Sequence, residues 1–276
     1  MKSRYRLGSN LAFSIRVILL LFPVSSALAA SRIELKYVVS YLHVTVGSGR
    51  WSLDLDRDRY KIAGAGQITG LITWLINGGG AGQAEGNIAR GFAQPDGFLA
   101  HIASSAEKDD IAISFQNGAV RTLQASPPFP AVPKRVPVTS EDLKGVIDPL
   151  SAAFVPANQD SEAGPCGKQL HIFDGRRRYD ATLQLKRSER VSIEPDYKGT
   201  AVVCSVRLLP ISGQLAEGSV AGFLAETKDD IEIEHALIGE AQVFVPVSAT
   251  IPTLVGTLHI NAQRITIEST DTKSSR

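Results

Sequence analysis

Apolar and polar residues alternate with a period of two along most of this chain, and glycine-bearing turns interrupt the alternation about every ten residues, which is the pattern of antiparallel β-sheets. The first clear strand has apolar side chains at every second position over Ile33–Val39 and is expected to continue through Val46. A turn at Gly47–Gly49 then returns the chain into a strand over Trp51–Asp56. The N-terminal part of the chain therefore predicts an antiparallel meander.

Two dipeptides predict tight hairpins. Asn117-Gly118 joins the strand-like segments 111–115 and 120–123, and Asp174-Gly175 stands between two similar segments. Asn, Asp and Gly accept the positive φ angles that short hairpin turns require. We expect each dipeptide to connect two neighbouring antiparallel strands.

Further alternating segments complete a nearly all-β chain. They are residues 191–193, 201–208, 231–236, 242–247 and 254–268. About a dozen strands result, and a flat sheet of that width would leave long adhesive edges, so the sheet must curl, split or close. The predicted fold is all-β with two short helices, built as a strongly curved antiparallel sheet in the form of an incomplete β-barrel or β-spiral.

Two segments depart from the alternation and predict the short helices. Residues 68–76 place apolar side chains at helical spacing and run into the glycine-rich end Asn77–Gly80, which is typical of a helix C-terminus. Residues 140–154 follow Thr139, with Asp142 three positions later, as in a capping box. Pro149 should interrupt this second helix because proline lacks a backbone donor.

A proline-rich stretch covers residues about 125–138, between the two halves of the chain. Its prolines are Pro127, Pro128, Pro130, Pro133 and Pro137. Such density favours an extended crossover without regular strand pairing. We expect this crossover to pass from one side of a curved sheet to the other within a single domain, residues 30–276. A boundary between two domains is the alternative.

Residues 1–29 have the composition of a secretory signal peptide. Four basic residues precede the apolar run 17–22, and Ala27-Leu28-Ala29 supplies a small-residue cleavage site, with cleavage expected after Ala29. The apolar run is too short to span a bilayer, no Cys follows the cleavage site to accept a lipid, and no later apolar run is long enough for a transmembrane helix. The mature protein is therefore expected in the periplasm.

The net charge argues against some partners. The chain has 29 basic and 28 acidic residues, and residues 1–29 hold four basic and no acidic residues, so the mature part carries 25 basic against 28 acidic residues, a net charge of −3. A net charge this small and negative produces only a weak electrostatic field, which favours neither nucleic acid nor an anionic membrane surface as a partner.

Cys166 and Cys204 are the two cysteines of the chain. An even count in an exported protein predicts one disulfide because that compartment is oxidising. A redox-active pair would need a close Cys-x-x-Cys arrangement, which these positions do not form. Metal ligation by two thiols alone is a weaker alternative.

Several motifs in the C-terminal half resemble one family in their order and spacing. They are Asp148-Pro149-Leu150-Ser151-Ala152, Cys166, Ile172-Phe173-Asp174-Gly175-Arg176-Arg177-Arg178-Tyr179, Tyr197-Lys198-Gly199, Cys204 and Pro210-Ile211-Ser212-Gly213. This arrangement resembles the exported proteobacterial proteins grouped as domain of unknown function 3108, most closely over residues 148–213. The resemblance implies a curved β-sheet, a role in cell-envelope integrity, and structural roles for Asp148, Pro149, Asp174, Gly175, Tyr179 and Gly199. It brings no catalytic residue.

Three consecutive arginines are the candidate anion-binding residues. In a strand, Arg176 and Arg178 share one face with Asp180, and Arg177 lies on the other. Guanidinium groups bind phosphate and carboxylate in pairs, so this hairpin is a candidate contact for a lipid phosphate, a cell-wall carboxylate or a partner. The alternative is a solvated hairpin whose arginines pair with nearby acids such as Asp174 and Asp180.

Two further patterns have simpler interpretations. Asp54, Asp56 and Asp58 alternate, but Arg59 and Ala65 stand where a calcium loop needs glycine and glutamate, so a solvated strand face is expected. The glycines at 78, 79, 80 and 82 lack the Gly-Lys-Ser/Thr ending of a phosphate-binding loop, so a flexible turn is expected.

The histidines show no paired spacing for zinc, and the chain has no Gly-x-Ser-x-Gly elbow. They are His43, His101, His171, His235 and His259, about one for each expected strand. The sequence therefore predicts no catalytic residue, no metal site and no cofactor.

The leading hypothesis is a non-enzymatic envelope protein that binds an apolar ligand, a lipid or a peptide, or a partner protein in a groove of the curved sheet. It follows from an excess of alternating apolar residues over what two short helices can cover. A structural or interaction protein with a filled interior is the alternative, and a secreted hydrolase is a third and weaker one.

Overall fold

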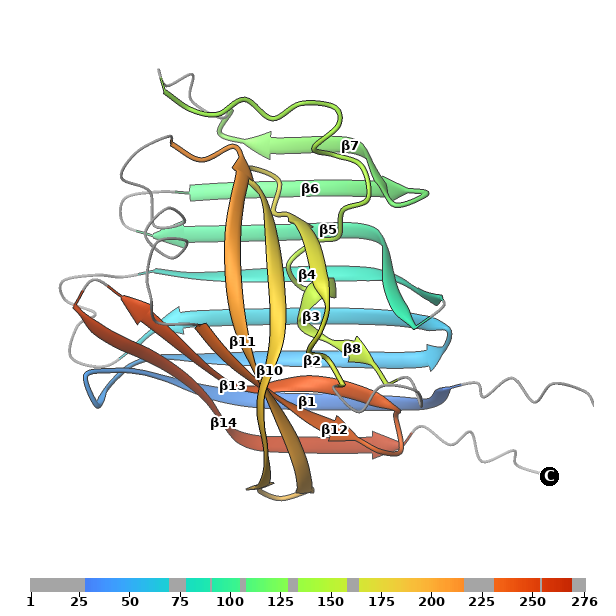
Figure 1. The fold of residues 1–276 in the computed structure, drawn as a ribbon, viewed down its shortest axis with the longest axis vertical. Coiled ribbons are helices and arrows are strands. Elements are labelled where there is room, and N and C mark those ends of the chain that lie inside the picture. The colour runs from blue at the N-terminus through green and yellow to red at the C-terminus, as the bar shows by residue number, and fades with distance from the viewer. Residues whose placement is uncertain are drawn as a thin grey trace, which may run out of the picture.

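The computed structural model describes residues 28–69, 78–89, 91–104, 108–128, 134–157, 164–215, 231–253 and 255–269. Within these residues, fourteen strands belong to one antiparallel sheet (Figure 1). The strand order is β7-β6-β5-β4-β3-β2-β1-β14-β13-β12-β11-β10-β9, and the short β8 pairs with β13.

The first seven strands form a meander in which each strand pairs with its neighbour in sequence. They are β1 (Leu28–Tyr41), β2 (Val44–Arg57), β3 (Arg59–Ile68), β4 (Gly78–Ala89), β5 (Phe92–Ser104), β6 (Lys108–Gln116) and β7 (Ala119–Ser126). The later strands are β8 (Val155–Pro156), β9 (Gln169–Phe173), β10 (Arg178–Ile193), β11 (Tyr197–Ser212), β12 (Ile231–Ile238), β13 (Val243–Thr253) and β14 (Gly256–Ser269). Pairing of β1 with β14 joins the two halves of the sheet.

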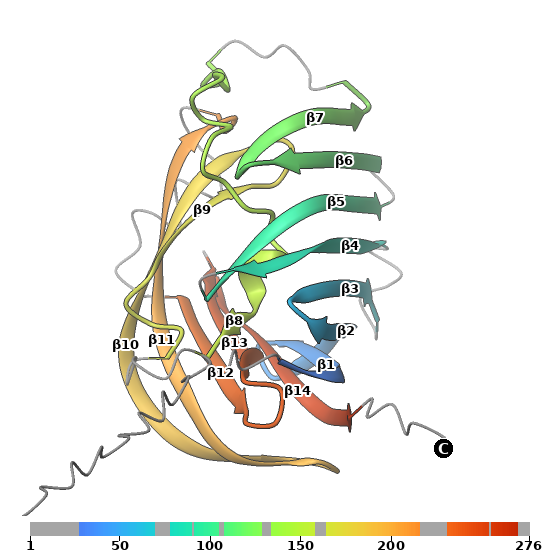
Figure 2. The same ribbon diagram turned by 90° about the vertical axis from the view of Figure 1, so that its right-hand side faces the viewer.

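The sheet curls so that its two halves face each other. Figure 2 shows β1–β7 as one wall and β10–β11 as the opposite wall, with β12–β14 linking them. The two end strands, β7 and β9, do not pair with each other. The prediction of a strongly curved antiparallel sheet that forms an incomplete barrel is confirmed.

A segment whose regular strand pairing is limited to the short β8 crosses between the two end strands. We call residues 143–157 the inner strap. Against β7, the Val120 amide donates to the Leu143 carbonyl oxygen at 2.9 Å and the Val146 amide to that of Gly118 at 3.2 Å. Against β9, the Ile147 amide donates to the His171 carbonyl oxygen at 2.9 Å, and the Phe173 amide donates back to Ile147 at 2.9 Å. The inner strap therefore satisfies backbone groups of both end strands.

The inner strap also supplies side chains to all three clusters of the hydrophobic core. Phe154 packs in the cluster built mainly from β1–β3 and β12–β14, Val155 in the cluster around the disulfide, and Val146 in the cluster built from β4–β6 and β9. Figure 2 shows this part of the chain between the two walls of the curled sheet. The strap therefore fills part of the interior of the curled sheet. The space that remains beside it depends on the size of the side chains on the facing strands.

The predicted disulfide is present. Cys166 and Cys204 lie with their Cα atoms 5.5 Å apart and are bonded. Both are buried, in the cluster formed by β9–β13. The bond ties the segment before β9 to the middle of β11.

The first predicted turn is wrong. The chain reverses at Leu42 and His43, which have φ angles of 49° and 66°, so that Tyr41 pairs with Val44. Residues Gly47–Gly49 lie inside β2 instead. Glycine favours turns because it adopts positive φ angles readily. Here two residues with side chains adopt the left-handed conformation, and the glycines lie inside a strand.

The predicted helix over residues 140–154 is wrong as well. Thr139 and Asp142 make the expected contact, since the Thr139 amide and hydroxyl both donate to Asp142 Oδ2 at 2.8 Å. No α-helix follows, and one turn of 3-10 helix over Ser151–Ala153 is the helical structure of this segment. The backbone groups of the strap bond to the end strands, and those bonds replace a helical ladder.

Other predictions have mixed outcomes. Asn117 and Gly118 form the hairpin turn with φ angles of 54° and 72°, as predicted. The β9–β10 hairpin is present, with a four-residue loop over 174–177 in place of a two-residue turn. The predicted flexible turn at 78–82 is wrong, because those glycines lie in β4.

Three predictions fall wholly or partly outside the described residues. Residues 1–27 of the expected signal peptide, residues 70–77 of the first expected helix, and residues 129–133 of the proline-rich crossover lie there. Within that helix prediction, Ile68 is the last residue of β3.

Candidate functional site

Glycines occupy the inner face of the sheet where β2, β3 and β4 run side by side. Gly49, Gly66 and Gly80 are direct register partners across these strands, and Gly64 pairs with Gly82 in the neighbouring inward-facing row. Alternate residues of a strand share one face, and Ile62 of the same face of β3 is buried in the core. These five positions therefore place no side chain in the interior, and the wall is hollow there.

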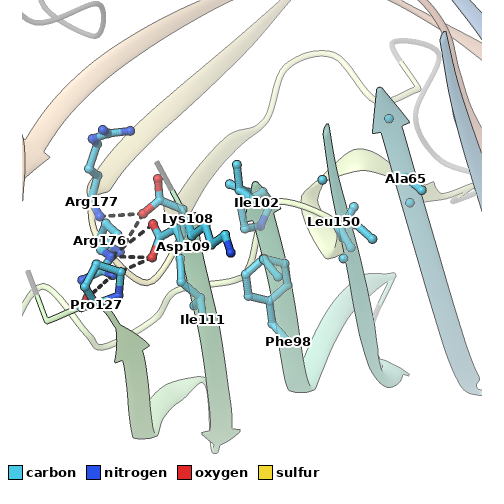
Figure 3. Close-up of a pocket in the computed structure, with 18 of the residues that line it drawn as sticks. Ala65, Phe98, Ile102, Lys108, Asp109, Ile111, Pro127, Leu150, Arg176 and Arg177 are labelled. Carbon is cyan, nitrogen blue, oxygen red and sulfur yellow. Dashed lines mark hydrogen bonds and ion pairs between the residues drawn. The ribbon is translucent and has the colours of Figure 1, made fainter. Parts of the chain in front are cut away.

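A cavity of about 460 Å³ occupies this hollow. Its apolar wall includes inward-facing residues of β5 and β6 and two residues of the inner strap (Figure 3): Phe98, Ala100, Ile102, Ile111, Pro149 and Leu150. Phe98 is buried, but Ile102 on the same strand is 51% exposed. A large apolar side chain of the inner face is therefore in contact with solvent inside an open cavity.

Leu150 closes one end of the cavity. A Cβ atom at Gly82 would lie 3.2 Å from Leu150 Cδ1, and one at Gly64 would lie 3.4 Å from Leu150 Cδ2. The leucine thus packs directly on the bare backbone of β3 and β4. Trp51, the register partner of Gly64, borders the same spot, with its Cδ1 atom 3.8 Å from the position of a Gly64 Cβ.

Asp148 fixes the position of Leu150. The Asp148 carboxyl is fully buried and accepts hydrogen bonds from the backbone amides of Leu150 and Ser151, both at 2.9 Å, and from the Ser151 hydroxyl at 2.5 Å. The Ser151 hydroxyl also shares a hydrogen bond of 2.7 Å with the Tyr60 hydroxyl on β3. Burial raises the pKa of Asp148 to about 6, against these hydrogen bonds, which lower it.

The opposite end of the cavity is charged. Arg176 pairs with Asp109 at 2.5 Å and donates to the Pro127 carbonyl oxygen at 2.6 Å, and the two charged side chains are only 9% and 18% exposed. Asp109 is the register partner of Ile102, so the apolar wall meets this ion pair directly. Because Arg176 and Asp109 lie 67 residues apart in sequence, the pair joins β6 to the β9–β10 loop across the gap between the walls.

The β9–β10 loop is held by Asp174. Its Oδ1 atom accepts the backbone amides of Arg176 at 2.8 Å and Arg177 at 2.6 Å. Burial raises the pKa of Asp174. Gly175 has a φ of 93°, and a side chain there would collide with Ile111. The loop is thus shaped to lie on the cavity wall.

Two cations at this end form no ion pair within 4.0 Å with a described residue, although Asp174 attracts Arg177 at longer range. Lys108 and Arg177 line the cavity and are exposed. Within the described part of the chain, neither the Lys108 ammonium nor the Arg177 guanidinium has an acidic side chain within 4.0 Å. Figure 3 shows both at the end of the cavity where Arg176 meets Asp109, away from Leu150.

The three candidate arginines therefore have three different environments. Arg176 is buried in its pair with Asp109, and Arg178 is buried in a pair with Asp180 at 2.5 Å. Hydrogen bonds from His171 and Arg178 hold the pKa of Asp180 below its usual range, although burial alone would raise it. Of the three, Arg177 is the exposed one. The alternative in which the arginines pair with nearby acids holds for Arg178 with Asp180, whereas Arg176 pairs with the distant Asp109, and both of these arginines are buried.

The remaining family-motif residues have positions that the structure makes plain. Pro149 lines the cavity. Tyr179 packs against the cluster that contains the disulfide, and burial raises its pKa. Gly199 lies beside Tyr197, whose hydroxyl would be 2.8 Å from a Cβ there. Pro149 and Asp174 thus line the cavity, and Asp148 and Gly175 lie next to residues that line it, whereas Tyr179 and Gly199 belong to the opposite wall.

The sequence missed most of the cavity. Its floor combines Gly80 and Gly82, which were expected in a flexible turn, with Gly64 and Gly66, for which no role was predicted. Its charged end needs Lys108 and Asp109, which belong to no predicted site. One signal was present: Gly64 and Gly66, and Gly80 and Gly82, are spaced by two residues, which places each pair on one face of a strand.

The described residues contain neither a cluster of metal ligands nor an apolar helix of membrane-spanning length. Among the described residues, no group of three or more His, Cys, Asp and Glu side chains converges as a metal site. The same residues include no helix with the length and apolar character needed to cross a membrane.

Comparisons with known proteins place the chain in a family. The crystal structure of a β-barrel-like protein of domain of unknown function DUF1849 from Brucella abortus is similar with a TM-score of 0.47 and 13% sequence identity, covering 88% of this chain and 100% of that one. No curated protein matches the chain. The family model described as "Protein of unknown function (DUF3108)" matches residues 36–262. The match extends well beyond the motifs at 148–213, and the chain belongs to the DUF3108 family.

Proposed function

We propose that this protein is a periplasmic, non-enzymatic binding protein that holds the apolar chain of an amphiphilic molecule in the cavity between β3–β6 and the inner strap. The observation that carries the proposal is an open cavity of about 460 Å³ with an apolar wall. Ligand pockets in proteins have volumes of about 300–1,000 Å³ and are mostly apolar.

The exposed apolar surface inside the cavity provides the driving force. Ile102 is 51% exposed in the free protein, and burying apolar surface is favourable by about 25 cal/mol per Å². The glycines beneath it leave the floor flat, so an extended hydrocarbon chain can lie against the backbone of β3 and β4. This arrangement favours a slender chain over a bulky ring system.

The periplasmic location rests on residues 1–29, which have the composition of a signal peptide. The intact mass of the protein recovered from the periplasm tests it. A mass that begins at Ala30 is expected, and a cytoplasmic protein that retains residues 1–29 would contradict it.

Binding is tested with the neutral fluorescent probe N-phenylnaphthylamine. Saturable binding at one site per chain is expected for the natural protein and should be lost in Gly66→Leu. A Cβ at Gly66 meets only the Ser48 carbonyl oxygen at 3.6 Å, so the added side chain projects into the cavity without a backbone clash. Ala63→Leu is the matched control, because Ala63 is exposed on the opposite face of β3 and does not line the cavity.

The outcomes separate this proposal from a protein with a filled interior. Equal probe binding by the natural protein, Gly66→Leu and Ala63→Leu would show that the cavity is not the site. No saturable binding by any of them would contradict a binding function for the cavity. Native mass spectrometry of the gently purified protein adds an independent readout, since a stoichiometric copurifying amphiphile supports the proposal.

A further inference from the structure

We infer that the ligand of this cavity is an amphiphile with a single acyl chain and an anionic head group, a carboxylate or a phosphate, and that Lys108 and Arg177 bind that head group. This inference rests on the proposed function and deepens it. It needs the cavity to be long enough for one chain, charged at one end only, and positive at that end.

The cavity volume matches one acyl chain. A water molecule takes about 30 Å³ of liquid volume and a methylene group takes about the same, so a cavity of about 460 Å³ holds a chain of about fifteen carbons. A phospholipid with two such chains needs about twice that volume. One such chain therefore fills the cavity, and the two-chain lipid in the test below decides whether a second chain is excluded.

The cavity is apolar at one end and charged at the other. Leu150 and the paired Gly64 and Gly82 lie at one end, and the ion pair of Arg176 with Asp109 lies at the other (Figure 3). A chain that enters with its tail toward Leu150 places its head group beside the ion pair. An amphiphile fits this gradient better than a wholly apolar molecule does.

The charged end has an excess of positive charge. Four basic and two acidic side chains line the cavity, so the lining carries a net charge of +2, in a mature chain whose expected net charge is −3. Arg176 and Asp109 neutralise each other in their ion pair. Asp174 attracts Arg177, and the fourth basic residue, Arg135, donates to the Gly213 carbonyl oxygen at 2.6 Å. Lys108 and Arg177 have no acidic partner within 4.0 Å in the part of the chain that the structure describes.

Their chemistry suits an anionic head group. A guanidinium presents a planar fork of donors that matches carboxylate and phosphate oxygens, and an ammonium acts as a point charge. The backbone of Arg177 is fixed by the hydrogen bond from its amide to Asp174. The loop thus fixes the backbone of Arg177 at the cavity end, and its side chain is exposed there.

The test compares head groups on one chain length. Palmitate, lysophosphatidate with one palmitoyl chain, and neutral monopalmitoylglycerol each displace N-phenylnaphthylamine from the natural protein, at concentrations below micelle formation. Two exposed charge contacts together are worth about a tenfold difference in Kd, so we expect both anions to bind about tenfold more tightly than the neutral lipid. This preference should shrink at high salt because exposed charges are screened.

Variants assign the effect to the two cations. Lys108→Gln and Arg177→Gln should each weaken binding of the anions by about two- to fivefold and leave monopalmitoylglycerol unchanged. Lys198→Gln is the control, because Lys198 is an exposed cation near the β10–β11 turn, far along the strands from this loop. Stronger binding of lysophosphatidate than of palmitate indicates a phosphate head group, and the reverse order indicates a carboxylate.

The results distinguish failure of the head-group and single-chain inferences from failure of the proposed binding function. Equal Kd values for anionic and neutral lipids, or a double variant that binds anions like the natural protein, would overturn the head-group inference while the proposed function stands. A two-chain phosphatidate that binds as tightly as lysophosphatidate would overturn the single-chain inference. If no amphiphile displaces the probe from the cavity, the proposed function fails, and this inference fails with it.

Discussion

The inner faces of β3–β4 and of β10–β11 are parts of one curled sheet, yet one is hollow and the other is filled. On β3 and β4, Gly64, Gly66, Gly80 and Gly82 leave the backbone bare and border the cavity. The opposite wall carries apolar side chains and one half of the cystine in the core cluster to which the inner strap contributes Val155: Ala181, Leu183, Val202, Cys204 and Val206. Both walls have the same antiparallel backbone pairing. The volume of the side chains at alternate positions therefore decides whether a wall packs as core or borders a cavity.

The two walls also differ in how the inner strap meets them. Val155 of the strap joins the cluster around the disulfide, so that wall is sealed by apolar packing. Against the glycines, Leu150 covers only the end of the bare surface, and the remainder is open. The strap bonds to both end strands through its backbone and packs side chains into all three core clusters, but it leaves the glycine surface of β3 and β4 largely uncovered.

The largest expected effect concerns the filled wall. Cys166→Ser and Cys204→Ser should each lower the free energy of unfolding by about 4 kcal/mol, the chain-entropy value for residues 38 positions apart. The double variant should lose no more than either single variant, because all three lack the same crosslink. Urea unfolding under non-reducing conditions measures this, and clearly additive losses would contradict the pairing.

The next effect is a pH dependence that originates at Asp148. Its pKa is about 6 in the folded protein against 3.8 for the unfolded chain, so the folded state binds more protons between these values and loses stability as pH rises through them. The loss relative to Asp148→Asn should be about 2 kcal/mol between pH ~4 and pH ~6, and should approach about 3 kcal/mol in total above pH ~7. Urea unfolding across this range checks it, and stability that rises with pH relative to the variant would contradict it.

Gly86 lies at the end of β4 where the interior is filled, and a substitution there tests how tightly that end is packed. A Cβ at Gly86 would overlap the Gln94 carbonyl oxygen and lie 2.8 Å from the Tyr60 hydroxyl. We expect Gly86→Ala to destabilise the protein by about 1–3 kcal/mol, as overpacking does. Thermal unfolding measures this, and a variant as stable as the natural protein would show that this end of β4 is loosely packed.

A glycine of the hollow end should give the smallest effect, with the opposite sign. Gly66 has ordinary strand geometry, and its Cβ would meet only the Ser48 carbonyl oxygen at 3.6 Å. Gly66→Ala should stabilise the protein by about 0.4–1 kcal/mol, because the unfolded chain loses entropy. The same thermal measurement applies, and a loss comparable to that of Gly86→Ala would mean that no hollow exists at Gly66.

Much of the fold could be predicted from local signals. The alternation gave the strands because a half-buried sheet imposes a period of two, and Asn117-Gly118 gave its turn because those residues accept positive φ. The disulfide followed from the count of cysteines and the expected compartment. These features depend on residues close in sequence or on composition.

The candidate site could not be predicted because its residues meet only after the sheet curls. Arg176 reaches Asp109 from 67 residues away, and nothing in the local sequence of either marks the other. Thr139 and Asp142 made their local contact, but the backbone after them bonds to β7 and β9, so a correct local signal gave a wrong helix. The glycines of β4 were expected in a turn and those of β3 drew no prediction, because the role of both sets depends on what lies across the interior.

The most direct measurement is a crystal structure of the protein grown with palmitate that carries bromine at the end of its chain. The account expects an anomalous bromine peak beside Leu150, over Gly64 and Gly82, with the carboxylate near Lys108 and Arg177. An ordered bromine on the outer face of the sheet, or a cavity that stays empty while the lipid is present in excess, would contradict it.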